Sequence, residues 1–306
     1  MCNFKRSTSE ATLYTRCDCE RDLIIISIYV DEIGYTDSSE RMLIEFKKEM
    51  MQRYEMLDLG LLHHFLGMGI LQTDQAIFVH QSKYAKSLLI KFGLEDYKLV
   101  SISVSTGDKL KKVDGSELAD EGLYWKIAGS LLYLTTTRPD LIYAASLLSR
   151  FMNCSTKRHM IVVRRVLRYV QGTLSYDIVY VRDQSATLIG FCDADWAESE
   201  DDSMSISGYV FSFGSGAFSW ASVNIVALSI AEAEYISTSE ATKQAMWLRF
   251  VFDDFGEMQT EATPLFCDNI IRALNSITNS TKSGTESSMG ERSEEDQKKM
   301  NKDNLL

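Results

Sequence analysis

Apolar residues in the first hundred positions form short runs and one helical stripe. The run 23–32, LIIISIYVDE, predicts a buried strand that ends in a tight hairpin, with Asp31 and Glu32 at the tip, because Gly34 breaks the pattern just beyond it. An amphipathic helix covering the sheet is predicted by four apolar residues at helical spacing: Leu43, Phe46, Met50 and Tyr54. A hairpin and a further helix follow, with predicted arms at 65–71 and 76–79 and a predicted helix at 82–92.

The middle of the chain changes character twice. Residues 101–121 are polar, contain glycine and a KLKK patch, and predict a long exposed connection with a hinge or domain boundary. A small helical bundle is predicted by three runs with helical spacing, at 121–135, 139–152 and 157–171. The stretch 174–181 then alternates as a strand and leads to a second boundary.

The last third of the chain predicts a sheet crossed by a helix. Strands are expected at 187–194, 207–213, 217–221 and 264–267, with a helix at 228–242. From Asn275 onward the chain has almost no apolar residues, so this tail cannot bury a core and is expected to be disordered.

Length and composition bound the class of protein. The 306 residues leave room for two domains, and a hydrophobic content of 45% allows each a core. The first apolar run is short and starts only at Leu23, and no stretch approaches the ~18 apolar residues of a membrane span. We therefore expect an intracellular chain without a signal peptide or transmembrane segment. Its six scattered cysteines form no CxxC pair, which favours reduced thiols and no zinc site.

The net charge of −11 argues against a protein that coats nucleic acid by bulk electrostatics, so any such contact must be local. The predicted helix 157–171 is the one segment that fits, because it carries five cations: Lys157, Arg158, Arg164, Arg165 and Arg168. They form either a solvated helix face or a surface that follows a nucleic acid backbone.

Two acids at the first hairpin are candidates for metal chemistry. Mg²⁺ prefers oxygen ligands, so Asp31 and Glu32 at the lip of a sheet are a physical route to phosphoryl transfer. The alternative is an ordinary polar turn, because acidic residues commonly end strands.

A second acidic set lies in the last third of the chain. Asp193 and Asp195 have strand spacing and share one face, and Asp268 follows the last predicted strand. Glu232 and Glu234 lie on different faces of the predicted helix, so only one of them can aim at Asp193. Acids at the ends of two strands and on a crossing helix are what two-metal hydrolysis of phosphodiesters needs, with ions ~3.5 to 4 Å apart.

Ordered motifs over nearly the whole chain resemble one family. Five segments are similar in order and spacing to the reverse transcriptase of copia-type LTR retrotransposons: TLYTR, LIIISIYVDE, FKKEMMQRYEMLDLGLLHHFLGMGI, AKSLLIKFG and YWKIAGSLLYLTTTRPDLIYAASLLSRFM. Four more resemble the RNase H domain that follows it: GFCDADWAE, SGYVFSFGSGAFSW, IVALSIAEAEYISTSEA and LFCDN. The resemblance covers residues 11–274. It implies an α+β / α/β fold, with a partial polymerase palm and helical thumb or connection, then an RNase H-like mixed sheet with flanking helices.

The same resemblance implies domains, ligands and partners. The domains would be a partial palm with the start of the thumb at 1–100, a helical thumb or connection at 101–183, a truncated RNase H-like domain at 184–276 and a disordered tail at 277–306. The implied catalytic residues are Asp193, Glu234, Asp268, Asp31 and Glu32, and all but Glu32 would bind Mg²⁺ or Mn²⁺. The implied partners are an RNA/DNA hybrid or template–primer and an upstream reverse transcriptase fragment.

Departures from the family's pattern lower the expected activity. Glu32 stands where the family has the second Asp of YVDD, and the family's other essential Asp is not present before Leu23, so we expect no DNA synthesis by this chain alone. The family's final His and Asp are missing after CDN, and Ser203 and Met204 stand where the family is usually basic. We expect a remnant with weak or no Mg²⁺-dependent hydrolysis of RNA in hybrids. The alternatives are a catalytically dead pseudogene product and a non-catalytic nucleic-acid-binding protein.

Overall fold

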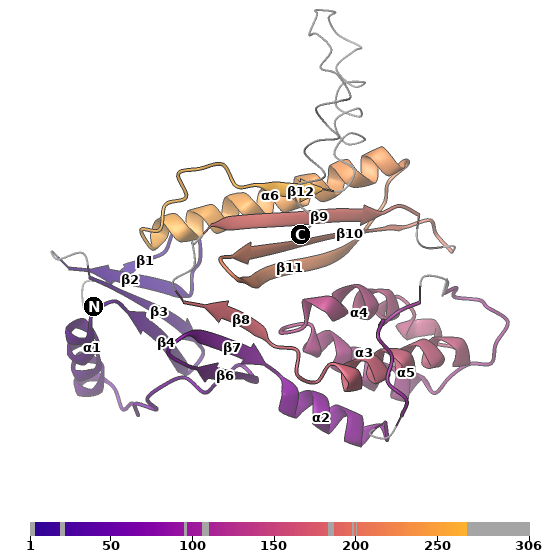
Figure 1. Ribbon diagram of the computed structural model, residues 1–306, viewed down its shortest axis with the longest axis horizontal. Helices are drawn as coiled ribbons and strands as arrows, with labels where there is room; N and C mark the ends of the chain where they lie inside the picture. The colour runs from indigo at the N-terminus through magenta and orange to yellow at the C-terminus, as the bar shows by residue number, and fades with distance from the viewer. Residues whose placement is uncertain are drawn as a thin grey trace, which may run out of the picture.

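The computed structural model combines three four-stranded sheets with six α-helices among the residues that it describes, which are 4–18, 22–94, 97–105, 110–182, 187–197, 199 and 201–267. Figure 1 shows the N-terminal sheet beside α1, a group of helices below the C-terminal sheet, and α6 along that sheet. The predicted mixed α/β class is confirmed at this level. No described helix is long and apolar enough to cross a bilayer.

The N-terminal sheet is built from two antiparallel hairpins. Its strands run in the order β1 (Lys5–Arg6), β2 (Leu13–Cys17), β3 (Leu23–Tyr29) and β4 (Glu32–Asp37), and α1 (Glu40–Arg53) follows. Ile24 and Ile26 alternate toward one face of β3 and bury against Met42 and Phe46 of α1. The predicted buried strand and amphipathic helix are both confirmed, since one strand face and one helix stripe supply this core.

The tip of the first hairpin differs from the prediction by one residue. Tyr29 pairs directly with Glu32, so the two residues of the turn are Val30 and Asp31. Val30 takes a positive φ of 53°, which the tight two-residue connection imposes. Glu32 therefore begins β4 and is not at the tip.

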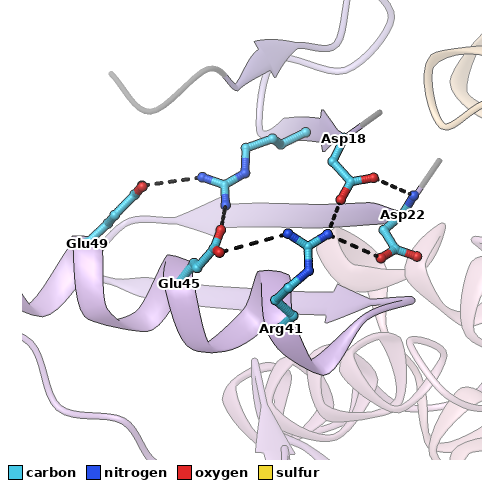
Figure 2. Close-up of polar contacts among 6 residues, drawn as sticks. Asp18, Asp22, Arg41, Glu45 and Glu49 are labelled. Atoms are coloured by element: carbon cyan, nitrogen blue, oxygen red, sulfur yellow. Dashed lines mark hydrogen bonds and ion pairs between the residues drawn. The ribbon is translucent and has the colours of Figure 1, made fainter. Parts of the chain in front are cut away.

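Ion pairs connect α1 to residues in or next to the two inner strands of this sheet, β2 and β3 (Figure 2). Arg16 of β2 lies 3.3 Å from Glu49 and 3.7 Å from Glu45, both on α1. Arg41 of α1 pairs with Asp18 and lies 3.8 Å from Asp22 at the start of the neighbouring strand. Partly exposed ion pairs each contribute little to the free energy of folding. Their role here is to orient a helix that buries only a narrow apolar stripe.

A second sheet brings together segments far apart in the sequence. Its strands run in the order β5 (His64–Phe65), β6 (Met68–Gln72), β7 (Ala76–His80) and β8 (Ile178–Val181), all antiparallel. The predicted hairpin is confirmed, and α2 (Ser82–Lys91) follows it as expected. Because β8 pairs with β7, the sheet contains strands from both sides of the boundary predicted at residue 100, and the domain division stays a prediction.

A helical unit lies between β7 and β8. It comprises α3 (Glu121–Leu134), η1 (Pro139–Leu141), α4 (Ile142–Ser149), η2 (Met152–Cys154) and α5 (Lys157–Gly172), in agreement with the three predicted runs. Their apolar faces form the largest buried cluster among the described residues, which includes Tyr124, Leu131, Leu148 and Leu167. The α5 helix starts with a capping box between Thr156 and His159.

The predicted exposed connection at 101–121 needs correction. Its described residues form no helix or strand before Glu121, as expected, but Leu110 is buried in the core of the helical unit. Backbone hydrogen bonds also tie the segment to the start of α5, from Lys157 to Glu117 (2.8 Å) and from Ala119 to Ser155 (3.0 Å). The polar composition of the segment did not reveal that Leu110 is buried. The segment is therefore attached to the helical unit along part of its length.

The C-terminal sheet has the order β11-β10-β9-β12. Its strands are β9 (Leu188–Asp195), β10 (Ser205–Phe213), β11 (Gly216–Ile225) and β12 (Leu265–Cys267), and only β12 runs parallel to its neighbour β9. α6 (Ile230–Asp254) packs on this sheet through Ala241, Ala245 and Leu248, against Leu188 and Phe211. The helix was predicted to end at Thr242, but apolar residues continue at helical spacing until Gly256, whose φ of +80° ends it.

The end of α6 is joined to the N-terminal sheet by one carboxylate. Asp254 accepts hydrogen bonds from the Ser7 hydroxyl (2.6 Å) and from the backbone N–H groups of Thr8 and Ser9 (both 3.1 Å). Two helical turns earlier, the Trp247 indole donates to the Ser9 carbonyl (3.1 Å). The hydrogen bonds that Asp254 accepts lower its pKa from 3.8 to about 2, with the Ser7 hydroxyl as the largest cause.

Replacing Asp254 by Asn is expected to lower the free energy of unfolding by about 1.5 kcal/mol at pH 7, because charge-assisted hydrogen bonds are lost. A lowered carboxyl pKa stabilises the fold above the unfolded-state value. The difference between wild type and variant should therefore be complete above pH ~4 and shrink as the pH falls toward 2. Urea unfolding of both proteins at pH 7 and pH 3 measures it, with Asp253→Asn as the control. Equal stability at pH 7 would contradict the assignment.

Candidate functional site

The acids of β9 lie at the end of a strand. Asp193 and Asp195 are exposed, whereas Cys192 between Phe191 and Asp193 is buried against α6. One carboxylate oxygen of Asp193 accepts a hydrogen bond from the backbone N–H of Ala194 (2.8 Å). Strand alternation thus directs the acids and the thiol to opposite faces, as the spacing predicted.

The first turn of α6 separates the roles of its two glutamates. Ser229 caps the helix by accepting from the Glu232 N–H (3.2 Å), and the Glu232 carboxylate accepts from the Leu228 N–H (2.7 Å). Glu232 is therefore used in capping its own helix. Glu234 is only 2% exposed and belongs to the buried face of α6. The spacing alone left both residues open as candidates, the family resemblance implies Glu234, and its role as a metal ligand stays a prediction.

A serine joins α6 to the end of β9. The Ser237 hydroxyl donates to the Asp193 carbonyl (2.8 Å), and it lies 3.4 Å from the carbonyl of Gly208, the residue that pairs with Asp193 across the sheet. Residues three apart on a helix share a face, so Glu234 lies one turn from this contact on the side that meets the sheet. The structure therefore brings the helical segment of Glu234 to the strand end of Asp193.

Two cysteines lie side by side next to these acids. Cys192 and Cys267 are directly paired in the parallel register of β9 and β12, and their sulfur atoms are 2.6 Å apart. Burial raises the pKa of the Cys192 thiol to about 12, and Cys267 reinforces the shift. A neutral thiol is a small core group, which agrees with the reduced state that the sequence predicts. Asp268, the third predicted acid, lies outside the described residues.

No group of three or more His, Cys, Asp or Glu side chains that could hold a metal ion occurs within the described parts of the chain. Asp193 and Glu234 offer the oxygen donors that Mg²⁺ prefers, and one of them is held in a buried position. Asp193 and Glu234 are the residues that would supply these donors, and the Ser237 bond fixes the backbone at Asp193 and the α6 turn of Glu234, not the direction of the two carboxylates. Mg²⁺ and Mn²⁺ binding remain predictions.

The acids of the first hairpin are in a different setting. Asp31 and Glu32 are both exposed, one in the turn and one at the start of β4. In the described structure, they do not form part of a three-residue acid, His or Cys cluster. Their predicted metal role is therefore supported only by sequence.

The five predicted cations of α5 occupy its outer side. Lys157, Arg158 and Arg164 are exposed, and Arg165 and Arg168 are half-buried. Lys157 pairs with Glu117, and the Arg168 guanidinium donates to the Lys98 carbonyl (2.5 Å). Seven inward residues of α5 are buried, so the predicted amphipathic helix is confirmed. Its cations remain either a solvated helix face or a surface that follows a nucleic acid backbone.

Sequence reasoning missed two features. It did not single out Ser237, whose hydroxyl fixes the contact between α6 and β9. It also missed that Lys112 meets the acids that follow β9: its backbone N–H donates to Asp201, and its ammonium pairs with Asp202. The signal was present in the opposite charges of the KLKK and ESEDD segments, but nothing in the sequence indicates that they meet.

The chain is similar in sequence to a known protein family and to several known proteins. Residues 1–106 match the family described as Reverse transcriptase (RNA-dependent DNA polymerase). The Retrovirus-related Pol polyprotein from transposon RE1 of Arabidopsis thaliana is 31% identical over 269 residues, which are 87% of this chain and 18% of that protein. The corresponding polyprotein from transposon TNT 1-94 of Nicotiana tabacum is 32% identical over 277 residues, 87% of this chain and 21% of the polyprotein.

A shorter relative is matched over most of its length. The Putative transposon Ty5-1 protein YCL074W of Saccharomyces cerevisiae is 30% identical over 246 residues, 79% of this chain and 80% of that protein. No solved structure matches the chain. The chain spans about a fifth of the length of the polyproteins that it matches. With the ordered motifs of both halves, these matches show that the chain belongs to the copia-type retrotransposon Pol family, with a reverse transcriptase match in its N-terminal third.

Proposed function

We propose that this chain is a retroelement-derived reverse transcriptase whose C-terminal part, residues 184–276, is an RNase H-like domain that hydrolyses RNA in RNA/DNA hybrids. Residues 1–100 are then a partial palm with the start of a thumb, and residues 101–183 a helical thumb or connection. The order β11-β10-β9-β12, with β12 parallel to β9 and α6 across the sheet, supports the C-terminal assignment.

The proposed site comprises Asp193, Glu234 and Asp268 as ligands of Mg²⁺. The observation that carries the proposal is the Ser237 hydrogen bond to the Asp193 carbonyl, because it fixes the α6 turn of Glu234 at the end of β9. The pairing of Cys192 with Cys267 adds that the two strands preceding Asp193 and Asp268 are in register. Acids from three separate elements are what phosphodiester hydrolysis by this route requires.

Each described residue has a separate task in this proposal. When bound, Mg²⁺ supplies positive charge that activates an attacking water and stabilises the leaving oxygen of the phosphodiester. Glu234 is buried, so its carboxylate has little side-chain freedom to lose when it binds the ion. Asp193 is exposed and can reach both an ion and a substrate phosphate. The paired cysteines fill the core beneath Asp193 without adding charge.

The N-terminal acids do not support DNA synthesis in this proposal. Glu32 places its carboxylate one methylene, roughly 1.5 Å, further from the backbone than Asp. A misplacement of about 1 Å in a preorganised site can cost about 10²-fold in rate. Glu32 also begins β4, where its backbone pairs with Tyr29 and fixes the direction of the side chain.

A second candidate function is nucleic acid binding without catalysis. The exposed side chains of Lys157, Arg158 and Arg164 on α5 favour it, because cations on one helix face can follow a phosphate backbone. Replacing Arg164 and Arg165 by Ala would then weaken salt-dependent hybrid binding. Absence of hybrid binding at low salt would leave the catalytically dead pseudogene product.

The experiment that tests the main proposal is a cleavage assay with the purified full chain. Its substrates are an RNA/DNA hybrid labelled on the RNA strand and a DNA duplex of the same sequence, each with Mg²⁺ or Mn²⁺. The proposal expects cleavage of the hybrid RNA only, and loss of cleavage with EDTA. RNA that stays intact in both the Mg²⁺ and the Mn²⁺ reactions would refute the catalytic proposal.

A further inference from the structure

The loop between β9 and β10 contacts the helical unit through two carboxylates. Asp201 accepts a hydrogen bond from the backbone N–H of Lys112 (2.6 Å). Asp202 lies 3.2 Å from the Lys112 ammonium and 3.1 Å from a guanidinium nitrogen of Arg150, at the end of α4. Lys112 and Arg150 thus form a pair of cations on the helical unit. The Asp202 carboxylate, from the loop after β9, binds to both of them.

The Arg150 side chain is more buried than is usual for a surface ion pair. Its side chain is 9% exposed, and its second terminal nitrogen, Nη1, is buried without a hydrogen-bond partner. A buried guanidinium nitrogen without an acceptor is costly. Asp202 contacts Nη2 through one oxygen, so the site has capacity for an anion with more oxygens. Phosphate groups match the guanidinium fork in this way.

The site adjoins the start of α5. Asp114, two residues after Lys112, accepts a hydrogen bond from the capping residue Thr156 (2.8 Å). The exposed cations Lys157 and Arg158 follow Thr156 directly. A phosphate chain bound at Lys112 and Arg150 would therefore find further cations next to it. The Ser199 hydroxyl, helped by Lys112, lowers the pKa of Asp202 to about 2, so the covering carboxylate is ionised at neutral pH.

We propose that Lys112 and Arg150 form a binding site for a backbone phosphate of nucleic acid, and that Asp201 and Asp202 of the same chain cover this site as an autoinhibitory contact. The inference rests on the nucleic acid binding that the proposed function requires. The covering loop competes intramolecularly, so it lowers the affinity for nucleic acid without contacting the proposed catalytic acids. Opening the contact frees two cations for phosphates at the same moment.

The test measures binding of a fluorescein-labelled RNA/DNA hybrid to the full chain by fluorescence anisotropy. The assay contains EDTA, so cleavage does not occur and failure of the nuclease proposal remains distinguishable. The variant Asp201→Asn/Asp202→Asn removes the covering charges, and the matched control Asp74→Asn/Asp253→Asn removes two exposed acids elsewhere. We expect the first variant to bind about tenfold more tightly than the control.

Two further measurements separate the site from a general charge effect. The plot of log affinity against log salt should become steeper by about 1 to 2 in the loop variant than in the control, because freed cations release more counterions. Adding Lys112→Gln to the loop variant should remove most of the gain, and circular dichroism checks that each variant is folded. Equal affinity of the loop variant and the control, or a gain that persists with Lys112→Gln, would overturn the proposal.

Discussion

Replacing Glu234 by Gln is expected to reduce cleavage of RNA in a hybrid by at least about 100-fold while the fold persists. Loss of a partner that only orients a metal ligand costs 10–100-fold, so loss of a ligand charge should cost no less. Gln keeps the size of the buried side chain, and so the packing of α6 on β9 should be retained. Initial rates with saturating Mg²⁺ measure the effect.

The matched control for this variant is Glu240→Gln. It makes the same chemical change on the same helix, and it removes only an exposed pair with Lys243. The control should cleave at the wild-type rate. A Glu234→Gln protein that is folded by circular dichroism and cleaves as fast as the control would remove Glu234 from the site.

Replacing Arg138 by Ala is expected to lower the free energy of unfolding by about 3 kcal/mol. Arg138 is 5% exposed and donates to both carboxylate oxygens of Asp140, at 2.8 and 2.6 Å. It also donates to the Thr173 carbonyl at 3.0 Å and lies over the rings of Tyr169 and Tyr176. One guanidinium therefore joins η1, just before α4, to the end of α5, and its removal breaks these contacts and leaves Asp140 with the Tyr169 hydroxyl as its donor.

Urea unfolding measures this loss, with two comparisons. Arg182→Ala removes an exposed arginine and should cost less than about 0.5 kcal/mol. Arg138→Lys keeps the charge but not the planar fork, so it should remain clearly destabilised. A loss below about 1 kcal/mol for Arg138→Ala would mean that the network does not hold the helices together.

The elements were largely predictable because their patterns are local. The apolar run at 23–29, the hairpin at 68–80 and the three helices of the helical unit follow from periodicity and turn residues. The second half of α6 was missed although its apolar residues continue at helical spacing and no Gly or Pro interrupts it before Gly256. The predicted turn was displaced by one residue, so Glu32 was placed at the tip although it begins β4. The pairing of Tyr29 with Glu32 decides this, and the local sequence does not reveal it.

The candidate site was predictable only in part. The predicted strands that precede Asp193 and Asp268 are both present, as β9 and β12, and the structure adds that they pair in parallel. The spacing did not distinguish Glu232 from Glu234, the family resemblance favoured Glu234, and the structure adds that Glu232 caps its own helix. Contacts between distant segments, such as Arg150 with Asp202, could not be predicted, because many surface charges are equally available as partners.

The proposed function requires that Asp193 and Glu234 bind the same metal ion. An anomalous difference map from crystals of the full chain soaked in MnCl₂ tests it most directly, because Mn²⁺ shares the oxygen preference of Mg²⁺. We expect one strong peak bonded to carboxylate oxygens of both Asp193 and Glu234, and no such peak in Glu234→Gln crystals. Wild-type crystals with no peak between these two side chains would show that the two acids do not share a metal ion.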